Sequence, residues 1–256
     1  MWGKPAFLNA AANATYAVAV VLVLYAAAVY LARLPAFSLR EVRVDGELKH
    51  VTRGEIETIV RRELKGGFFT VNLAATRAAF ERLPWVRGAN VRRQWPARLD
   101  VALEEHVPFA RWAGQSRLPG AVNPVALVNT HGEVFHAAHE GDLPVFIGPE
   151  GAAREMAIQY RYFHRALGTI GETPVQVRVT TRRAWQIKLA SGPALELGRE
   201  SIEARLRRFV ALHDRTVGRL GQAVDTVDLR YANGFAVRIP ELRHEKVEPK
   251  RGRRAG

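Results

Sequence analysis

Cysteine is absent from this chain of 256 residues. Its absence excludes disulfide bonds, thiolate metal sites and a cysteine nucleophile. Charge is absent from one long stretch, because no acidic residue, basic residue or histidine lies between Lys4 and Arg33. The rest of the chain is rich in charge, so this stretch differs from everything that follows it.

The sequence signatures of the common enzyme classes are also missing. None of the serines lies in a Gly-x-Ser-x-Gly turn, and there is no His-Glu-x-x-His, phosphate-loop or Gly-x-Gly-x-x-Gly pattern. Glu104 and Glu105 are consecutive on a predicted strand, so they point to opposite faces and form a poor pair for acid–base chemistry. The sequence therefore gives no support for catalysis, a cofactor or a small-molecule substrate, and we expect a protein that is not an enzyme.

Histidines are the remaining candidates for a metal site. His131, His136 and His139 lie near one another in the sequence. Their spacing crosses a predicted turn and strand, so nothing places them on one face, and surface histidines are the favoured interpretation. We therefore predict no metal site.

What the chain has in excess is positive charge. The formal net charge is +13 and the sequence pI is near 10.8. The basic residues are spread over many predicted elements and do not form one stripe, so we expect a solvated surface and no nucleic-acid partner. Because 48% of the residues are apolar, the chain can bury a sizeable core.

The uncharged stretch predicts a membrane-spanning helix over residues 14–34, after a short tail of residues 1–13. A span needs about 20 apolar residues, and Tyr16 and Tyr30 suit the two interfaces. Pro35 favours an end at Leu34. The alternative is a cleaved signal peptide on a secreted periplasmic binding module, but such apolar regions run only about 7–15 residues. Charge counts do not settle the orientation, because long domains translocate largely regardless of charge.

Residues 36–108 read as a compact α+β domain. A strand runs to Asp45-Gly46, Thr52 and Glu55 form a capping box, and Asn72 caps a second helix. Two strands joined by a turn at residues 95–98 complete a β-α-α-β-β order.

The second strand of that hairpin has a clear apolar face. Leu99, Val101, Leu103 and Val107 alternate with polar residues. Aromatic residues at strand ends usually pack, so Trp95 and Trp112 are expected in the core.

Residues 109–243 predict a mostly antiparallel β domain with two amphipathic helices. Asn-Thr-His-Gly at residues 129–132 signals one hairpin. The last hairpin has Asn233-Gly234 at its tip and a final strand over residues 234–239, which we expect at the edge of the sheet. The charged tail, residues 244–256, is predicted to be disordered.

Several motifs together resemble a known family. Residues 37–112 look like a POTRA domain, and VRRQWPARLDVALEEHVPFARW, GPEGAAREM, TRRAWQIKL, LELGRE, RLRRFV and VDLRYANGFAV resemble, in order, the FtsQ/DivIB family of bacterial cell division proteins. The resemblance implies a single-pass inner-membrane protein with a cytoplasmic N-terminus, periplasmic domains and a place at the division septum. It also implies a non-enzymatic scaffold of the divisome that helps control septal peptidoglycan synthesis.

The same resemblance implies protein partners and a binding site. The partners are FtsB and FtsL, together with other divisome proteins. FtsB would add to the exposed last strand by β-augmentation. The partner-binding residues expected on this basis are Arg182, Arg230, Tyr231, Gly234, Phe235, Val237 and Ile239.

Overall fold

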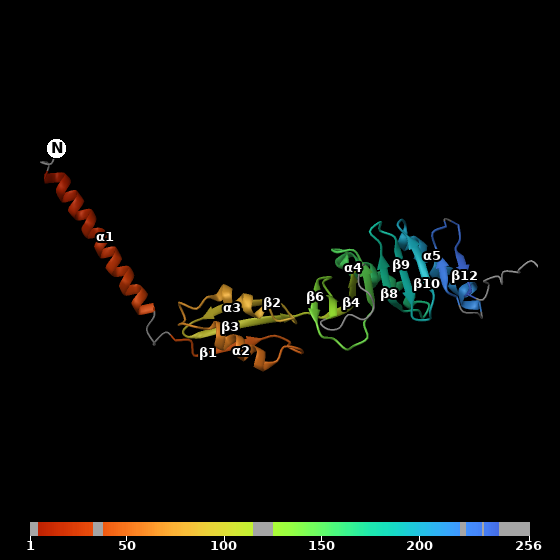
Figure 1. Ribbon diagram of the computed structural model, residues 1–256, viewed down its shortest axis with the longest axis horizontal. Helices are drawn as coiled ribbons and strands as arrows, with labels where there is room; N and C mark the ends of the chain where they lie inside the picture. The colour runs from red at the N-terminus through yellow and green to blue at the C-terminus, as the bar shows by residue number, and fades with distance from the viewer. Residues whose placement is uncertain (1–4, 33–37, 115–124, 221–223, 232, 241–256) are drawn as a thin grey trace, which may run out of the picture. The chain divides into compact units, whose positions relative to one another are not determined.

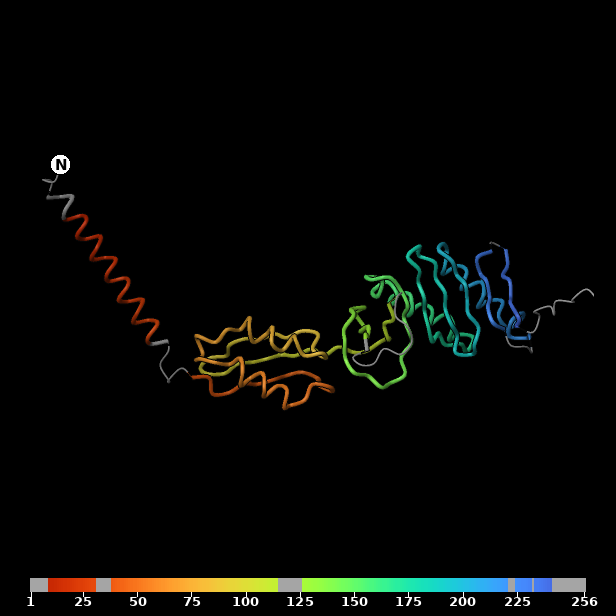
Figure 2. The backbone as a smooth tube through the Cα atoms, in the orientation of Figure 1, coloured from red at the N-terminus to blue at the C-terminus, as the bar shows by residue number. Residues whose placement is uncertain are grey.

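The structure is a computed structural model that describes residues 5–32, 38–114, 125–220, 224–231 and 233–240. The chain divides into two compact units, Met1–His106 and Val107–Gly256. Figure 1 labels the helices and strands, and Figure 2 traces the backbone through both units. The folded part of the first unit, residues 38–106, is the α+β domain, and the second unit contains the β domain.

The N-terminal helix α1 spans Pro5–Ala32. Within it, Asn9–Tyr30 is long and apolar enough to cross a membrane, and none of that window is buried against the protein. Large apolar side chains such as Val18, Leu22 and Tyr25 are exposed, as lipid-facing residues would be. The helix begins earlier than the predicted span, and the predicted end at Leu34 lies outside the described residues.

The α+β domain follows the predicted β-α-α-β-β order. Its elements are β1 (Glu41–Asp45), α2 (Arg53–Glu63), α3 (Leu73–Phe80), β2 (Val86–Gln94) and β3 (Arg98–Glu105). The sheet order is β1-β3-β2, with β1 parallel and β2 antiparallel to β3. Leu99, Val101 and Leu103 of β3 are buried against Ile59 of α2 and Phe80 of α3. The alternation in the sequence therefore placed the correct face inward.

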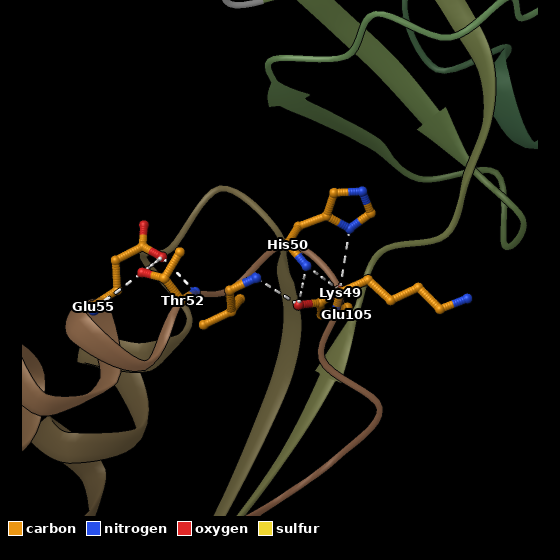
Figure 3. Close-up of polar contacts among 6 residues, drawn as sticks. Lys49, His50, Thr52, Glu55 and Glu105 are labelled. Carbon is orange, nitrogen blue, oxygen red and sulfur yellow. Dashed lines mark hydrogen bonds and ion pairs between the residues drawn. The ribbon is translucent and has the colours of Figure 1, made fainter.

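Hydrogen bonds to side chains fix the helix starts in this domain. Thr52 and Glu55 form the predicted capping box, in which Glu55 N–H donates to the Thr52 hydroxyl and Thr52 N–H donates to the Glu55 carboxylate at 2.8 Å (Figure 3). The Asn72 side chain accepts from Ala75 N–H at 3.0 Å. Each cap satisfies backbone donors that a helix leaves unpaired at its first turn.

A carboxylate at the end of β3 holds the chain that leads into α2. Glu105 accepts from the backbone N–H groups of Lys49 at 3.0 Å, His50 at 3.1 Å and Val51 at 2.8 Å (Figure 3). Burial of the Glu105 carboxyl raises its pKa, but these three donors outweigh burial and hold the pKa below its ordinary value. The His50 ring stacks on Trp85 with ring centroids 3.7 Å apart. The segment before α2 is thus fixed from two sides.

Two expectations about this hairpin were wrong. Trp95 is 75% exposed, because it lies at the β2–β3 turn where residues 92–96 are all exposed and is not among the residues of the domain's core cluster. Val107 is 57% exposed and belongs to the second unit, because β3 ends at Glu105. Trp112, in contrast, is partly buried and packs against the core of the β domain, as predicted.

The β domain is built on one nine-stranded sheet. Its strands are β4 (Pro108–Gly114), β5 (Val125–Asn129), β6 (Val134–Ala137), β7 (Val145–Gly148), β8 (Pro174–Val179), β9 (Trp185–Leu189), β10 (Ala194–Gly198), β11 (Thr226–Asp228) and β12 (Ala236–Arg238). The order is β12-β11-β10-β9-β8-β7-β4-β5-β6. The pairs β4–β7, β7–β8 and β10–β11 are parallel and the other five pairs are antiparallel. The sheet is therefore mostly antiparallel.

Helices cover one face of this sheet. These helices are α4 (Ala153–Gly168) and α5 (Ile202–Leu212), and two short 3-10 turns, His213–Arg215 and Val217–Arg219, follow α5. Phe163 of α4 and Phe209 of α5 join strand residues such as Ile187 and Leu195 in one core cluster. Between these inward residues β9 carries Gln186 and β10 carries Glu196, so the opposite face is polar at these two strands.

Candidate functional site

Strand β12 lies at one edge of the nine-stranded sheet, as the sequence predicts. It is shorter than expected, Ala236–Arg238, and pairs antiparallel with β11. Asp225 N–H donates to Arg238 C=O at 2.9 Å, so the backbone groups of Arg238 face β11. Because these groups alternate along a strand, the N–H and C=O of Val237 point away from β11. Within the described ranges, no other strand pairs with β12 on that side.

The hairpin that ends in β12 is more open than its Asn-Gly signal suggests. The strands β11 and β12 are joined by residues 229–235, so Asn233-Gly234 does not form a tight two-residue turn. Arg208 of α5 donates from Nη2 to the Tyr231 carbonyl at 2.6 Å and holds this connection against the helix. The Tyr231 side chain remains 58% exposed beside the edge strand.

A shallow groove of about 1050 Å³ runs over the polar face next to this edge. Its floor is a row of residues in register across four strands, with Gln186 beside Glu196, Glu196 beside Asp228, and Asp228 beside Ala236. Gln186 donates from Nε2 to the Glu196 carboxylate at 2.6 Å. The residues that line the groove are Gln186, Glu196, Thr226, Asp228, Arg230, Tyr231, Ala236, Val237, Arg238 and Ile239.

Arg230 is held in place by Asp228. The Arg230 Nε lies 2.8 Å from one Asp228 carboxylate oxygen, and Nη2 lies 2.6 Å from the other. The Arg230 backbone N–H also donates to Asp228 at 3.0 Å. The hydrogen bond from the Arg230 side chain outweighs the burial of Asp228 and holds the pKa of that carboxyl below its ordinary value. The same carboxylate raises the pKa of Arg230.

This ion pair leaves part of the guanidinium available. An arginine side chain carries five N–H donors in a fixed fork, and the contacts with Asp228 use one on Nε and one on Nη2. The Arg230 side chain is 62% exposed, so the remaining donors can reach an incoming acceptor. Asp228 thus presents an oriented cation beside Tyr231, where an exposed arginine alone would be free to rotate.

Gly198 makes room for this arrangement. It adopts a φ of +75°, a left-handed backbone conformation that residues with a side chain rarely adopt. A Cβ at this position would lie 2.8 Å from Nη1 of Arg205 and 3.1 Å from Cγ of Arg230. The glycine therefore lets the Arg230 stem pass close to the end of β10.

The structure brings most of the expected partner-binding residues to this corner of the sheet. Arg230, Tyr231, Val237 and Ile239 line the groove. Phe235 turns inward, is partly buried and contacts Phe209 edge-to-face at 6.0 Å, and Gly234 precedes it outside the groove lining.

Arg182 lies on a different connection. It is exposed in the β8–β9 turn, where Thr180 accepts from Arg183 N–H at 2.9 Å. That turn is at the same end of the sheet as Gly198, because Trp185 at the start of β9 is in register with Gly198 at the end of β10. Arg182 is not among the groove residues.

Sequence reasoning missed the acidic half of this site. Glu196 and Asp228 alternate with buried Leu195 and Val227, so the pattern predicts that their side chains point away from the core. The sequence did not predict that Glu196 and Asp228 are in register on the parallel strands β10 and β11, because no local turn specifies a parallel pairing. Within the described part of the chain, no group of three or more His, Cys, Asp or Glu side chains is placed to bind a metal ion.

Comparison with known proteins identifies both folded parts. Residues 37–106 match the model of the POTRA domain, FtsQ-type, and residues 117–230 match that of the cell division protein FtsQ/DivIB, C-terminal. A solved structure of POTRA1-2 of the periplasmic domain of Omp85 from Anabaena, which is 14% identical, aligns over 60% of this chain and 95% of its own length with a TM-score of 0.25, too low to bear on the fold.

Curated relatives are similar over nearly the whole chain. The cell division protein FtsQ of Nitrosospira multiformis is 43% identical over 243 residues, which cover 93% of this chain and 99% of that protein. FtsQ of Burkholderia pseudomallei is 40% identical, covering 95% of this chain and 96% of that protein. FtsQ of Bordetella pertussis is 32% identical, covering 99% of this chain and all of that protein. With its apolar N-terminal helix, its FtsQ-type POTRA domain and its C-terminal sheet, this chain belongs to the FtsQ/DivIB family of cell division proteins.

Proposed function

We propose that this chain is a single-pass inner-membrane scaffold of the divisome that binds FtsB through the free edge of β12. Helix α1 anchors the protein, the N-terminus is cytoplasmic, and the POTRA and β domains are periplasmic at the division septum. FtsL joins the same complex. The assembly links early and late division proteins and helps control septal peptidoglycan synthesis, with no catalytic step in this chain.

The observation that carries this proposal is the edge of β12 beside the Arg230–Tyr231 corner. An unprotected strand edge accepts another extended chain through backbone hydrogen bonds. Val237 offers backbone groups that point away from β11. Arg230, oriented by Asp228, favours an acidic side chain on the incoming strand, and exposed Tyr231 offers apolar contact area.

The test is a binding measurement on the full chain in detergent. Arg230→Glu and Tyr231→Ala should each weaken FtsB binding by about tenfold or more, because an arginine or tyrosine at the centre of an interface commonly contributes about 1.4 kcal/mol or more. The matched control is Arg165→Glu on the exposed side of α4, which changes the charge equally and should bind as the wild type does. Unfolding curves show whether each variant is folded.

The same variants test the role in cells. Filamentation should follow loss of FtsB binding, and Arg165→Glu should divide normally. If Arg230→Glu and Tyr231→Ala are both folded and both bind FtsB as tightly as the wild type, the interface is elsewhere.

Topology has a separate test. Alkaline phosphatase fused after Gly256 should be active, because that enzyme needs the periplasm to fold. A silent phosphatase fusion together with an active cytoplasmic reporter at the same position would reverse the orientation. A fluorescent fusion at the N-terminus should gather at the septum.

A further inference from the structure

Trp95 is the most exposed aromatic side chain of the POTRA domain. It is 75% exposed at the β2–β3 turn, and the residues around it, from Arg92 to Pro96, are all exposed. Phe69, in the connection between α2 and α3, is 50% exposed. Large aromatic side chains in water forgo the stabilisation that burial gives, so two exposed rings toward one end of a packed domain indicate a contact surface.

These residues lie at the end of the domain where the chain enters it. Arg40 N–H donates to Ala97 C=O at 2.9 Å, and Glu41 at the start of β1 is in register with Arg98 at the start of β3. Figure 1 shows the β2–β3 turn at the same end of the sheet as the start of β1. Arg93 donates from Nε to Phe68 C=O at 2.7 Å and ties the Phe69 connection to the end of β2.

The covalent chain limits how far this end can be from the membrane. Helix α1 ends at Ala32, and Arg40 follows eight residues later. A fully extended chain of this length spans at most about 29 Å. The Trp95 turn is hydrogen-bonded to Arg40, so it is tethered near the end of α1. Glu105 lies at the opposite end of β3 and has no such short tether to α1.

The charge at this end is positive. Arg92 lies 3.6 Å and Arg98 lies 3.0 Å from the Asp100 carboxylate, so that acid neutralises only one of them. The charged side chains next to the turn are Arg40, Glu41, Arg92, Arg93, Arg98 and Asp100, an excess of two positive charges. Arginines with a neighbouring tryptophan suit a surface that combines negative headgroups with an apolar interior.

We infer that the Trp95 turn docks on the surface of the membrane that α1 spans. The Trp95 ring enters the interfacial layer, where amphipathic rings are favoured, and the arginines contact anionic phospholipid headgroups. Phe69, on the connection that Arg93 ties to the end of β2, adds apolar contact. The contact makes a second attachment and restricts how the POTRA domain can swing on its tether. It is independent of the β12 edge, so it holds or fails separately from FtsB binding.

The test uses the full chain in phospholipid nanodiscs. Because the chain contains no cysteine, a single introduced cysteine takes a spin label at one position only. Gln94→Cys places the label beside Trp95, and Glu47→Cys places it on an exposed residue beyond the end of β1. In nanodiscs that contain phosphatidylglycerol, the label at 94 should be several-fold less accessible to a water-soluble relaxation agent than the label at 47.

Second substitutions in the Gln94→Cys chain identify the cause. Trp95→Ser should restore access to the level seen at position 47, and Trp95→Tyr should keep the protection, since tyrosine also favours the interface. Arg92→Gln should reduce it. The matched controls are Ile158→Ser and Arg165→Gln in the β domain, an exposed apolar residue and an exposed cation, and neither should change access.

Three results would overturn the inference. Equal access at positions 94 and 47 would show that the turn stays in water. Protection that survives Trp95→Ser would point to a protein contact, including one with a second copy. Protection of the same size in nanodiscs of phosphatidylcholine alone would exclude an anionic lipid site.

Discussion

The two edges of the nine-stranded sheet are built differently. At one edge, β6 contributes Phe135 and Ala137 to the buried side, and its hairpin with β5 turns within four residues. At the other edge, β12 has no fully buried side chain and follows a connection of seven residues. The β6 edge therefore comes from a short hairpin with buried side chains, and the β12 edge from a longer connection and a strand with none fully buried.

The turn before β6 shows how the first edge is fixed. Asn129 is fully buried; its Oδ1 accepts from the N–H groups of His131 and Glu133, each at 2.9 Å, and its Nδ2 donates to Glu133 at 2.7 Å. Near β12 the connection is held by Arg208 of α5, which donates to the Tyr231 carbonyl, and by the Asp228–Arg230 pair within the hairpin itself. Arg161 of α4 donates to Thr130 C=O in the β5–β6 turn, so the two edges differ in the buried Asn129 and in the length of the connection. An exposed strand edge can accept another extended chain through its backbone groups, with neighbouring side chains giving selectivity.

The largest effect should come from the turn asparagine at the β6 edge. Asn129→Leu leaves two partly buried N–H groups without their acceptor and should lower the free energy of unfolding of the β domain by about 2–3 kcal/mol. Urea unfolding of the full chain measures it. The matched control is Asn233→Ala near β12, where an exposed asparagine should contribute less than about 0.5 kcal/mol. Equal losses at both positions would remove the contrast between the edges.

Proline substitutions at the two edges test which of them binds FtsB. Val237→Pro removes an N–H that points away from the sheet and should weaken FtsB binding by about tenfold, the equivalent of one backbone hydrogen bond of about 1.4 kcal/mol. Val134→Pro removes an outward-pointing N–H from β6, because Asn129 N–H donates to Glu133 C=O and the backbone groups of the next residue point away from β5. This variant serves as the control at the other edge. Titration calorimetry should show a loss for Val237→Pro alone. A loss for Val134→Pro alone would assign the partner to β6.

The smallest effect concerns acid. Because Arg230 holds the folded-state pKa of Asp228 below its ordinary value of 3.8, the ion pair stabilises the β12 corner at any pH above that value. The contribution is lost only as the pH falls through the lowered pKa. Thermal unfolding should therefore show little change between pH 7 and about 5 from this pair, followed by a loss below about 4.

Asp228→Asn separates this carboxylate from the others. The variant should lose less thermal stability below about pH 4 than the wild type does, because it lacks the ion pair that acid disrupts. It should also bind FtsB a few-fold more weakly at pH 7, because Arg230 loses its orientation. Asp142→Asn, an exposed acid before β7, should leave both properties unchanged. An acid profile that Asp228→Asn does not alter would mean that the pair contributes nothing to the corner.

Much of the fold was predictable because its determinants are local. The uncharged stretch gives α1, the Thr52–Glu55 spacing gives the start of α2, and alternation gives the inward face of β3. The Asn-Thr-His-Gly turn gives the β5–β6 hairpin. In each case the residues that decide the structure lie within a few positions of one another, and their order in the chain is enough.

The rest was decided by long-range packing. Strands β4 and β7 pair in parallel across more than thirty residues of sequence, and no turn in between specifies that pairing, so neither strand was predicted as such. Trp95 was expected in the core and is exposed, whereas Phe235 was expected at the partner site and packs on Phe209. A side chain's residue type shows that it gains from burial, but only the tertiary structure shows whether a neighbour covers it.

The sequence by itself determined the long apolar N-terminal helix, the two folded parts, the family and the position of the last strand at an edge. Only the tertiary structure decided that Asp228 orients Arg230, that Glu196 and Gln186 form the floor beside them, and that Arg40 bonds to Ala97 in the Trp95 turn. Periodicity along one strand sets which face a side chain takes. Which strand becomes its neighbour, and in what register, depends on the packing of residues far apart in the chain.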